Sequence, residues 1–125
     1  MGALSLTALA FSAFAEDALP QVPCEAYIVM DADSGQVLME HNADEVLFPA
    51  SITKIMTMGL AIEKAAGDWN QTVTVSYDAV HQLEAGSDHV ALMEDERIRL
   101  EDLLYATAMP SANDAANVLA EFIGN

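Results

Sequence analysis

At the centre of the sequence lies the segment Phe48-Pro49-Ala50-Ser51-Ile52-Thr53-Lys54-Ile55-Met56-Thr57. Pro49 predicts a boundary, because a proline disfavours the helical conformation in the residue before it. After it, apolar residues recur at helical spacing as far as Ala65, and Gly67 is suited to end the helix. Since the other faces are also largely apolar, the pattern predicts a helix in the middle of a domain.

Ser51 and Lys54 stand three positions apart, so a helix that begins at Ser51 brings both side chains to one face. The Ser51 amide would then lie among the unpaired donors of the helix N-terminus, where it can stabilise an oxyanion. A buried, uncharged Lys54 can take the proton of the Ser51 hydroxyl. A serine N-cap followed by a surface lysine has the same spacing, so the spacing alone does not decide between a nucleophile–base pair and a helix cap.

A second candidate segment is Ser111-Ala112-Asn113, directly after Pro110 and before a predicted helix over 114–123. A hydroxyl and an amide at alternate positions of a tight loop can both point into one cleft. Serine and asparagine are also ordinary turn and cap residues. Ser111 and Asn113 are therefore candidate site residues that the local pattern alone does not establish.

The flanking sequence predicts short elements of both kinds. A well-buried strand over 26–30, a turn at Asp33-Ser34-Gly35 and a strand over 36–41 form a predicted β-hairpin. Further along we expect a strand over 72–75, a brief helix capped by Ser76 that runs through His81, a loop over 84–88, a strand over 90–92 and a helix over 101–109. This order predicts the α+β class and not the βαβ alternation of a parallel sheet.

Charge and length restrict the function. The chain has 125 residues, enough for one domain, with 20 acidic and 4 basic residues and a formal net charge of -16. Nucleic acid is an improbable partner, since phosphate backbones require clustered Lys and Arg. Cys24 is the single cysteine, so no intrachain disulfide can form. The three histidines have no metal-ligand spacing, and we expect no metal.

The N-terminus has the composition of an export signal. Residues 1–15 contain no charge, and Ala13-Phe14-Ala15 is followed at once by Glu16. This predicts a signal peptide over 1–15, although its usual positive start is missing, and a linker over 16–25. A buried N-terminal helix is the alternative. Export would place the rest of the chain in the periplasm or on the outer face of the cytoplasmic membrane.

Taken together, the segments resemble one family. The segment 48–57 is similar to the active-serine segment of the D-alanyl-D-alanine carboxypeptidases, the low-molecular-mass penicillin-binding proteins. Residues 103–105 and 110–116 resemble their second motif and its flanks, and the hairpin over 27–41 resembles theirs. The resemblance covers nearly all of 25–124. It implies a β-lactamase/transpeptidase-like fold, an antiparallel sheet packed with helices, of which 26–125 would be an incomplete domain.

The resemblance also implies residue roles. Ser51 would be the acylated nucleophile and Lys54 its general base. Ser111 would relay a proton to the leaving D-alanine, and Asn113 would bind the substrate and help to position Lys54. The substrate would be a peptidoglycan stem peptide ending in D-Ala-D-Ala, β-lactams would acylate the same serine, and no metal or organic cofactor would be needed.

Two departures from the family pattern leave the exact activity open. The family's third motif, K-T-G, is absent, because neither Lys54 nor Lys64 is followed by Thr-Gly. We therefore expect an N-terminal part of a longer protein that is inactive alone, with any membrane anchor in a missing C-terminal segment. A class A serine β-lactamase is the nearest rival, but it has S-D-N where Ala112 stands here. The same motifs are compatible with a D,D-endopeptidase, and the missing third motif with a non-catalytic fragment.

Overall fold

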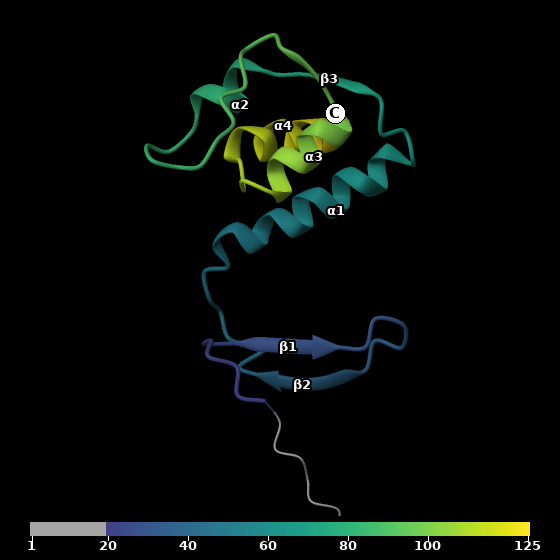
Figure 1. Ribbon diagram of the computed structural model, residues 1–125, viewed down its shortest axis with the longest axis vertical. Helices are drawn as coiled ribbons and strands as arrows, with labels where there is room; N and C mark the ends of the chain where they lie inside the picture. Colours follow the sequence, from purple (N-terminus) through teal and green to yellow (C-terminus); the bar gives the residue numbers. More distant parts are fainter. Residues whose placement is uncertain (1–19) are drawn as a thin grey trace, which may run out of the picture. The chain divides into compact units, whose positions relative to one another are not determined.

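The computed structural model describes residues 20–125 (Figure 1). The predicted signal peptide over 1–15 and the first part of the predicted linker lie outside the described residues. The chain divides into two compact units, Met1–Val46 and Leu47–Asn125. No helix among residues 20–125 has the length and apolar character needed to cross a bilayer.

The first unit contains the predicted β-hairpin. Strand β1 (Tyr27–Met30) pairs antiparallel with β2 (Val37–His41). The turn between them forms because the Asp31 carboxylate accepts hydrogen bonds from the amide and hydroxyl of Ser34. Gly35 follows at a φ of +72°, a conformation that glycine adopts without a steric cost. The hairpin and its turn are thus confirmed.

The expected burial of β1 is wrong for this structure. Ile28, Val29 and Met30 are 51%, 41% and 50% exposed. A two-stranded hairpin has one apolar face and no layer of its own to cover that face. The apolar run therefore predicted the position of the strand correctly but its burial incorrectly.

The second unit contains the helices and a second small sheet. Its elements are a 3₁₀ turn η1 (Ala50–Ile52), α1 (Thr53–Ala65), β3 (Thr72–Thr74), α2 (Tyr77–His81), β4 (Arg97–Arg99), α3 (Leu100–Ala108) and α4 (Asn113–Gly124). Strands β3 and β4 pair antiparallel. The described residues therefore form two small antiparallel sheets with helices, which confirms the α+β class.

Helix α4 is at the centre of this unit. It packs against α1, α2 and α3, and Figure 1 shows α3 and α4 side by side with α1 along them. Its apolar side buries Ala115, Val118 and Leu119 against Leu100 and Leu103 of α3. The expectation that the helix after Ser51 would lie in the middle of the domain is wrong for this structure.

Helix α1 instead buries one narrow stripe. Ala61 and Ala65 are its buried residues, whereas Ile55 and Met56 are 65% and 67% exposed, and Ile52 of the preceding η1 turn is 67% exposed. Small alanine side chains allow α1 to approach α4 closely, and within the second unit the side chains of Ile55 and Met56 lie on a face that no other element covers. A second layer against α1 would bury these residues.

The region between α2 and α3 differs from the expected strand over 90–92. The amides of Val90 and Leu92 donate to the two carboxylate oxygens of Asp114, at 3.2 Å and 3.0 Å, so they are not available to a sheet. The strand that pairs with β3 is Arg97–Arg99, whose single apolar residue, Ile98, faces Val73. The predicted Ser76 cap is confirmed, because the Ser76 hydroxyl accepts from the Ala79 amide.

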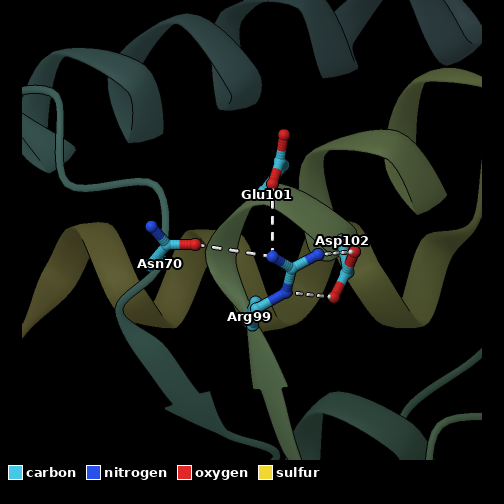
Figure 2. A network of polar contacts seen from close by, with 4 residues as sticks. All are labelled: Asn70, Arg99, Glu101 and Asp102. Atoms are coloured by element: carbon cyan, nitrogen blue, oxygen red, sulfur yellow. Dashed lines mark hydrogen bonds and ion pairs between the residues drawn. The ribbon is translucent and has the colours of Figure 1, made fainter.

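A polar cluster joins β4 to the start of α3. Figure 2 shows the Arg99 guanidinium between Asp102, Glu101 and Asn70. Two parallel hydrogen bonds of 2.9 Å and 3.0 Å connect it to Asp102, and Glu101 lies 3.5 Å away. A third hydrogen bond, of 3.4 Å, reaches Asn70 in the loop before β3. Arg99 therefore fixes the first turn of α3 against the connection that follows α1.

Candidate active site

Ser51 lies in the 3₁₀ turn that precedes α1. The turn is entered through Ala50, whose φ of +49° is unusual for a residue with a side chain. The Ile52 amide donates to the Pro49 carbonyl oxygen, and the α-helix proper begins at Thr53. The predicted helix start is therefore displaced by two residues, and Ser51 occupies the tight turn before it.

Lys54 is directed back towards Ser51, as the spacing predicted. Its Nζ atom donates a hydrogen bond to Ser51 Oγ at 3.3 Å. The Lys54 side chain is half-buried and not enclosed as expected, because the neighbouring apolar residues of α1 point elsewhere. Within residues 20–125 the ion pairs are those of Arg99, so no described carboxylate pairs with Lys54.

Ser111 approaches the same hydroxyl from a distant part of the sequence. Its Oγ atom donates to Ser51 Oγ at 2.8 Å, a contact between residues 60 positions apart. Ser111 has a φ of +61°, in the left-handed region that a non-glycine residue occupies at a cost of about 1–3 kcal/mol. The next amide, of Ala112, donates to the Ala106 carbonyl of α3, and Ala112 is fully buried. This anchorage holds Ser111 in place despite its strained backbone.

Asn113 begins α4 beside this group. Its backbone amide and its side-chain Nδ2 both donate to the Asp88 carbonyl oxygen, at 2.8 Å and 3.0 Å. The described hydrogen bonds thus connect Asn113 to the loop before Val90 and not to Lys54. Asn113 nevertheless lines the same cavity as Ser51 and Lys54.

The three predicted positions share one hollow of about 440 Å³ in the second unit. The residues that line it come from η1, α1, the loop after α2 and α4: Ala50, Ser51, Thr53, Lys54, Thr57, Glu84, Ser87, Asn113, Ala116, Asn117 and Ala120. Ser111 contacts Ser51 at its edge. The structure therefore brings together the four residues that the two sequence segments suggested.

Sequence reasoning missed the residue that organises the loop beside the site. Asp114 is 1% exposed, and its carboxylate accepts hydrogen bonds from the amides of Val90, Leu92 and Ala115. An acid in the first turn of a helix suggests only an interaction with the helix dipole. No feature of the sequence indicates that its partners lie more than twenty positions upstream.

This arrangement is suited to nucleophilic catalysis. A hydroxyl in contact with an amine and a second hydroxyl can transfer its proton as it attacks a carbonyl carbon. The hydrogen bonds of the turn begin at Ile52, so the Ser51 amide stays available to an oxygen that develops negative charge. The described residues include no grouping of His, Cys, Asp or Glu side chains suited to a metal ion.

Comparison with known proteins gives a consistent result. Residues 12–125 match the family model described as D-alanyl-D-alanine carboxypeptidase. The chain is 38% identical over 120 residues to D-alanyl-D-alanine carboxypeptidase DacC of Escherichia coli, with 91% of this chain and 30% of that protein covered. It is 35% identical over 99 residues to DacF of Bacillus subtilis, with 77% and 25% covered.

Solved structures agree with the sequence relatives. Penicillin binding protein 5 from Haemophilus influenzae superimposes with a TM-score of 0.69 at 32% identity, covering 85% of this chain and 32% of that one. The D-alanyl-D-alanine carboxypeptidase from Mycobacterium tuberculosis gives 0.71 at 32% identity, covering 85% and 38%. The present chain thus spans between 25% and 38% of the length of each of these proteins.

Proposed function

The chain belongs to the D-alanyl-D-alanine carboxypeptidase family, and from this membership we propose that the complete protein is a serine-type D-alanyl-D-alanine carboxypeptidase. It would remove the terminal D-alanine from peptidoglycan stem peptides, and β-lactams would acylate the same serine. The observation that supports this most is the position of Ser51 Oγ, 3.3 Å from Lys54 Nζ and 2.8 Å from Ser111 Oγ.

Acylation would begin at Ser51. Its oxygen attacks the carbonyl carbon between the two D-alanines while its proton passes to the Lys54 side-chain nitrogen. This forms a tetrahedral intermediate with a negatively charged oxygen, which the Ser51 amide can stabilise. The distance between the two side chains is within the range in which such a proton transfer becomes direct after a small movement.

Breakdown of the intermediate requires a proton on the leaving nitrogen. Ser111 would supply it: its hydroxyl proton goes to the departing D-alanine, and the Lys54 ammonium replaces that proton. The C–N bond breaks and an ester to Ser51 remains. Water then attacks the ester, releases the shortened peptide and restores the Ser51 hydroxyl. Asn113 would hold the peptide backbone in the cavity that it lines.

The test uses the complete protein encoded by this reading frame. After exposure to a fluorescent penicillin, mass spectrometry should find the adduct on Ser51, and Ser51→Ala should abolish it. Lys54→Ala should slow acylation at least about a hundredfold, since a positioned general base typically contributes 10²–10⁴-fold. Ser34→Ala, an exposed serine of the hairpin turn, serves as the matched control and should be labelled like the wild type.

An adduct on any other residue, or labelling that persists in Ser51→Ala, would refute the proposal. Hydrolysis of a D-Ala-D-Ala peptide compared with turnover of a penicillin separates the carboxypeptidase from a β-lactamase. A cross-linked peptide substrate separates both from an endopeptidase. We also propose that the protein is exported, which detection of the mature chain in a periplasmic or cell-surface fraction would test.

A further inference from the structure

The cavity at Ser51 continues along the loop after α2. A second hollow of about 210 Å³ is lined by Gln82, Leu83, Glu84, Ser87, Asn113 and Asn117. Four of these residues, Glu84, Ser87, Asn113 and Asn117, also line the cavity that contains Ser51. The two hollows are therefore contiguous, with Asn113 at their junction. Under the proposed function, a peptide bound at Asn113 and acylated at Ser51 would reach the second hollow through this junction.

The wall of this second hollow carries one free negative charge. Among the described residues that line the two hollows, Glu84 is the carboxylate and Lys54 the cation. The hydrogen bonds and ion pairs within residues 20–125 engage the Glu84 backbone carbonyl, which accepts from Ser87, but not its side chain. No described group pairs with the Glu84 carboxylate, so the carboxylate is available to a ligand.

The loop that carries Glu84 is connected firmly to α4. Asn113 holds the Asp88 carbonyl oxygen through two hydrogen bonds, and the Asp114 carboxylate holds the amides of Val90 and Leu92. Ser87 closes a turn back onto Glu84. The first turn of α4 therefore positions both Asn113 and the end of the loop at Asp88, four residues after Glu84.

We propose that Glu84 is a specificity-determining residue, which selects stem peptides that carry a free ammonium group on the residue preceding the D-Ala-D-Ala end. This inference rests on the proposed function. The ammonium would lie in the second hollow beside the Glu84 carboxylate. The same charge repels the C-terminal carboxylate of the peptide, so it also disfavours binding in the reverse direction.

The test compares two peptides with the complete protein. Both end in Lys-D-Ala-D-Ala, one with a free lysine side-chain amine and the other with that amine acetylated. The wild type should prefer the free amine about three- to fivefold in kcat/KM at low ionic strength, the size expected of one solvent-accessible charge pair. Added salt should reduce this preference, because it screens the pair.

Variants then locate the preference. Glu84→Gln should bring the ratio of the two kcat/KM values close to one, and Glu84→Asp should retain most of it. Using the ratio removes any general loss of activity or folded protein that a variant causes. Glu94→Gln removes an equal charge from an exposed position outside both hollows and should keep the wild-type ratio.

The outcomes separate this inference from the proposed function. Absence of penicillin acylation at Ser51 would refute the carboxypeptidase proposal itself. Normal acylation combined with no preference in the wild type would overturn the role of Glu84 alone. So would a preference that survives in Glu84→Gln, or one that Glu94→Gln abolishes equally, since net charge and not this wall would then be responsible.

Discussion

Ser111 presents its hydroxyl to Ser51 from a backbone conformation that most residues avoid. Ser111→Gly and Ser111→Ala both remove the hydroxyl, but only glycine has no Cβ to clash at a φ of +61°. We expect the glycine variant to have the higher free energy of unfolding, by roughly 1 kcal/mol, while both variants lose peptidase activity. Urea denaturation of the two variants of the complete protein measures the difference. Equal stabilities would show that the position is not strained.

Asp114 is the residue whose loss should cost most stability near the site. Asp114→Ala leaves the Val90 and Leu92 amides without their carboxylate acceptors. We expect the free energy of unfolding to fall by about 2–3 kcal/mol, because unsatisfied donors lose their hydrogen bonds and keep part of their desolvation penalty. Asp114→Asn keeps one acceptor oxygen, so its free energy of unfolding should fall less than that of Asp114→Ala.

The control for Asp114 is Asp44→Ala. Asp44 is exposed, and none of the hydrogen bonds within residues 20–125 involves its side chain. Its replacement should change the free energy of unfolding by less than about 0.5 kcal/mol. If Asp114→Ala were as mild as this control, the carboxylate would not be what holds the loop.

At the scale of the elements, the Arg99 cluster should make the stability of the α3 N-terminus depend on pH. The hydrogen bonds from Arg99 hold the pKa of Asp102 below its ordinary value of 3.8. A carboxylate with a lowered pKa stabilises the folded state above its ordinary pKa, and this contribution is lost as pH falls through the lowered one. The junction drawn in Figure 2 should therefore weaken in acid.

Asp102→Asn tests this dependence. The variant should be less stable than the wild type at neutral pH, and the difference should shrink once the pH falls below 3.8. Urea unfolding followed at several pH values measures it, with Asp78→Asn, an exposed acid of α2, as the control. A difference that stays constant down to the most acidic pH would contradict the assignment.

Elements governed by local chemistry could be predicted from the sequence. The Ser76 cap, the hairpin turn and the helix after Pro110 depend on residues within a few positions of one another. The strand at 97–99 could not, because its one apolar residue, Ile98, is flanked by arginines whose partners lie across β3 and α3. Likewise, Val90 and Leu92 are residue types that favour a strand, but their amides donate to the distant Asp114 carboxylate and not to a neighbouring strand.

The site was predictable to the same extent. Helical spacing predicted that Lys54 would reach Ser51, and the structure shows this contact although Ser51 lies in the 3₁₀ turn before α1. The contact of Ser111 with Ser51 required the resemblance to a family, since nothing local connects residues 60 positions apart. Glu84 and Asp114 could not be found from the sequence, because their importance depends on how the loop after α2 lies against α4.

For the molecule as a whole, the exposed apolar side chains of α1 and the hairpin predict how residues 1–125 behave alone. With Ile52, Ile55 and Met56 each about two-thirds exposed, the purified 125-residue chain should bind a hydrophobic dye strongly and associate in a concentration-dependent way. It should also react with a fluorescent penicillin far more slowly than the complete protein. Labelling at an equal rate would show that residues 1–125 contain all the groups that acylation needs.

The net charge of -16 predicts a response to salt. A stem peptide that ends in a carboxylate approaches an acidic protein against electrostatic repulsion, which added salt screens. Activity of the complete protein towards the acetylated peptide should therefore rise with ionic strength at fixed pH. The acetylated peptide is the appropriate probe, because it has no ammonium group for Glu84 to attract. A flat or falling response would contradict this expectation.

The contact between Ser51 and Ser111 also orders events at the ribosome. Ser51 is translated first, and Ser111 emerges 60 residues afterwards. At typical synthesis rates this delay is about 3–12 seconds. During that interval the growing polypeptide contains Ser51 but lacks the second hydroxyl that contacts it, so the arrangement of the two side chains can form only late in synthesis.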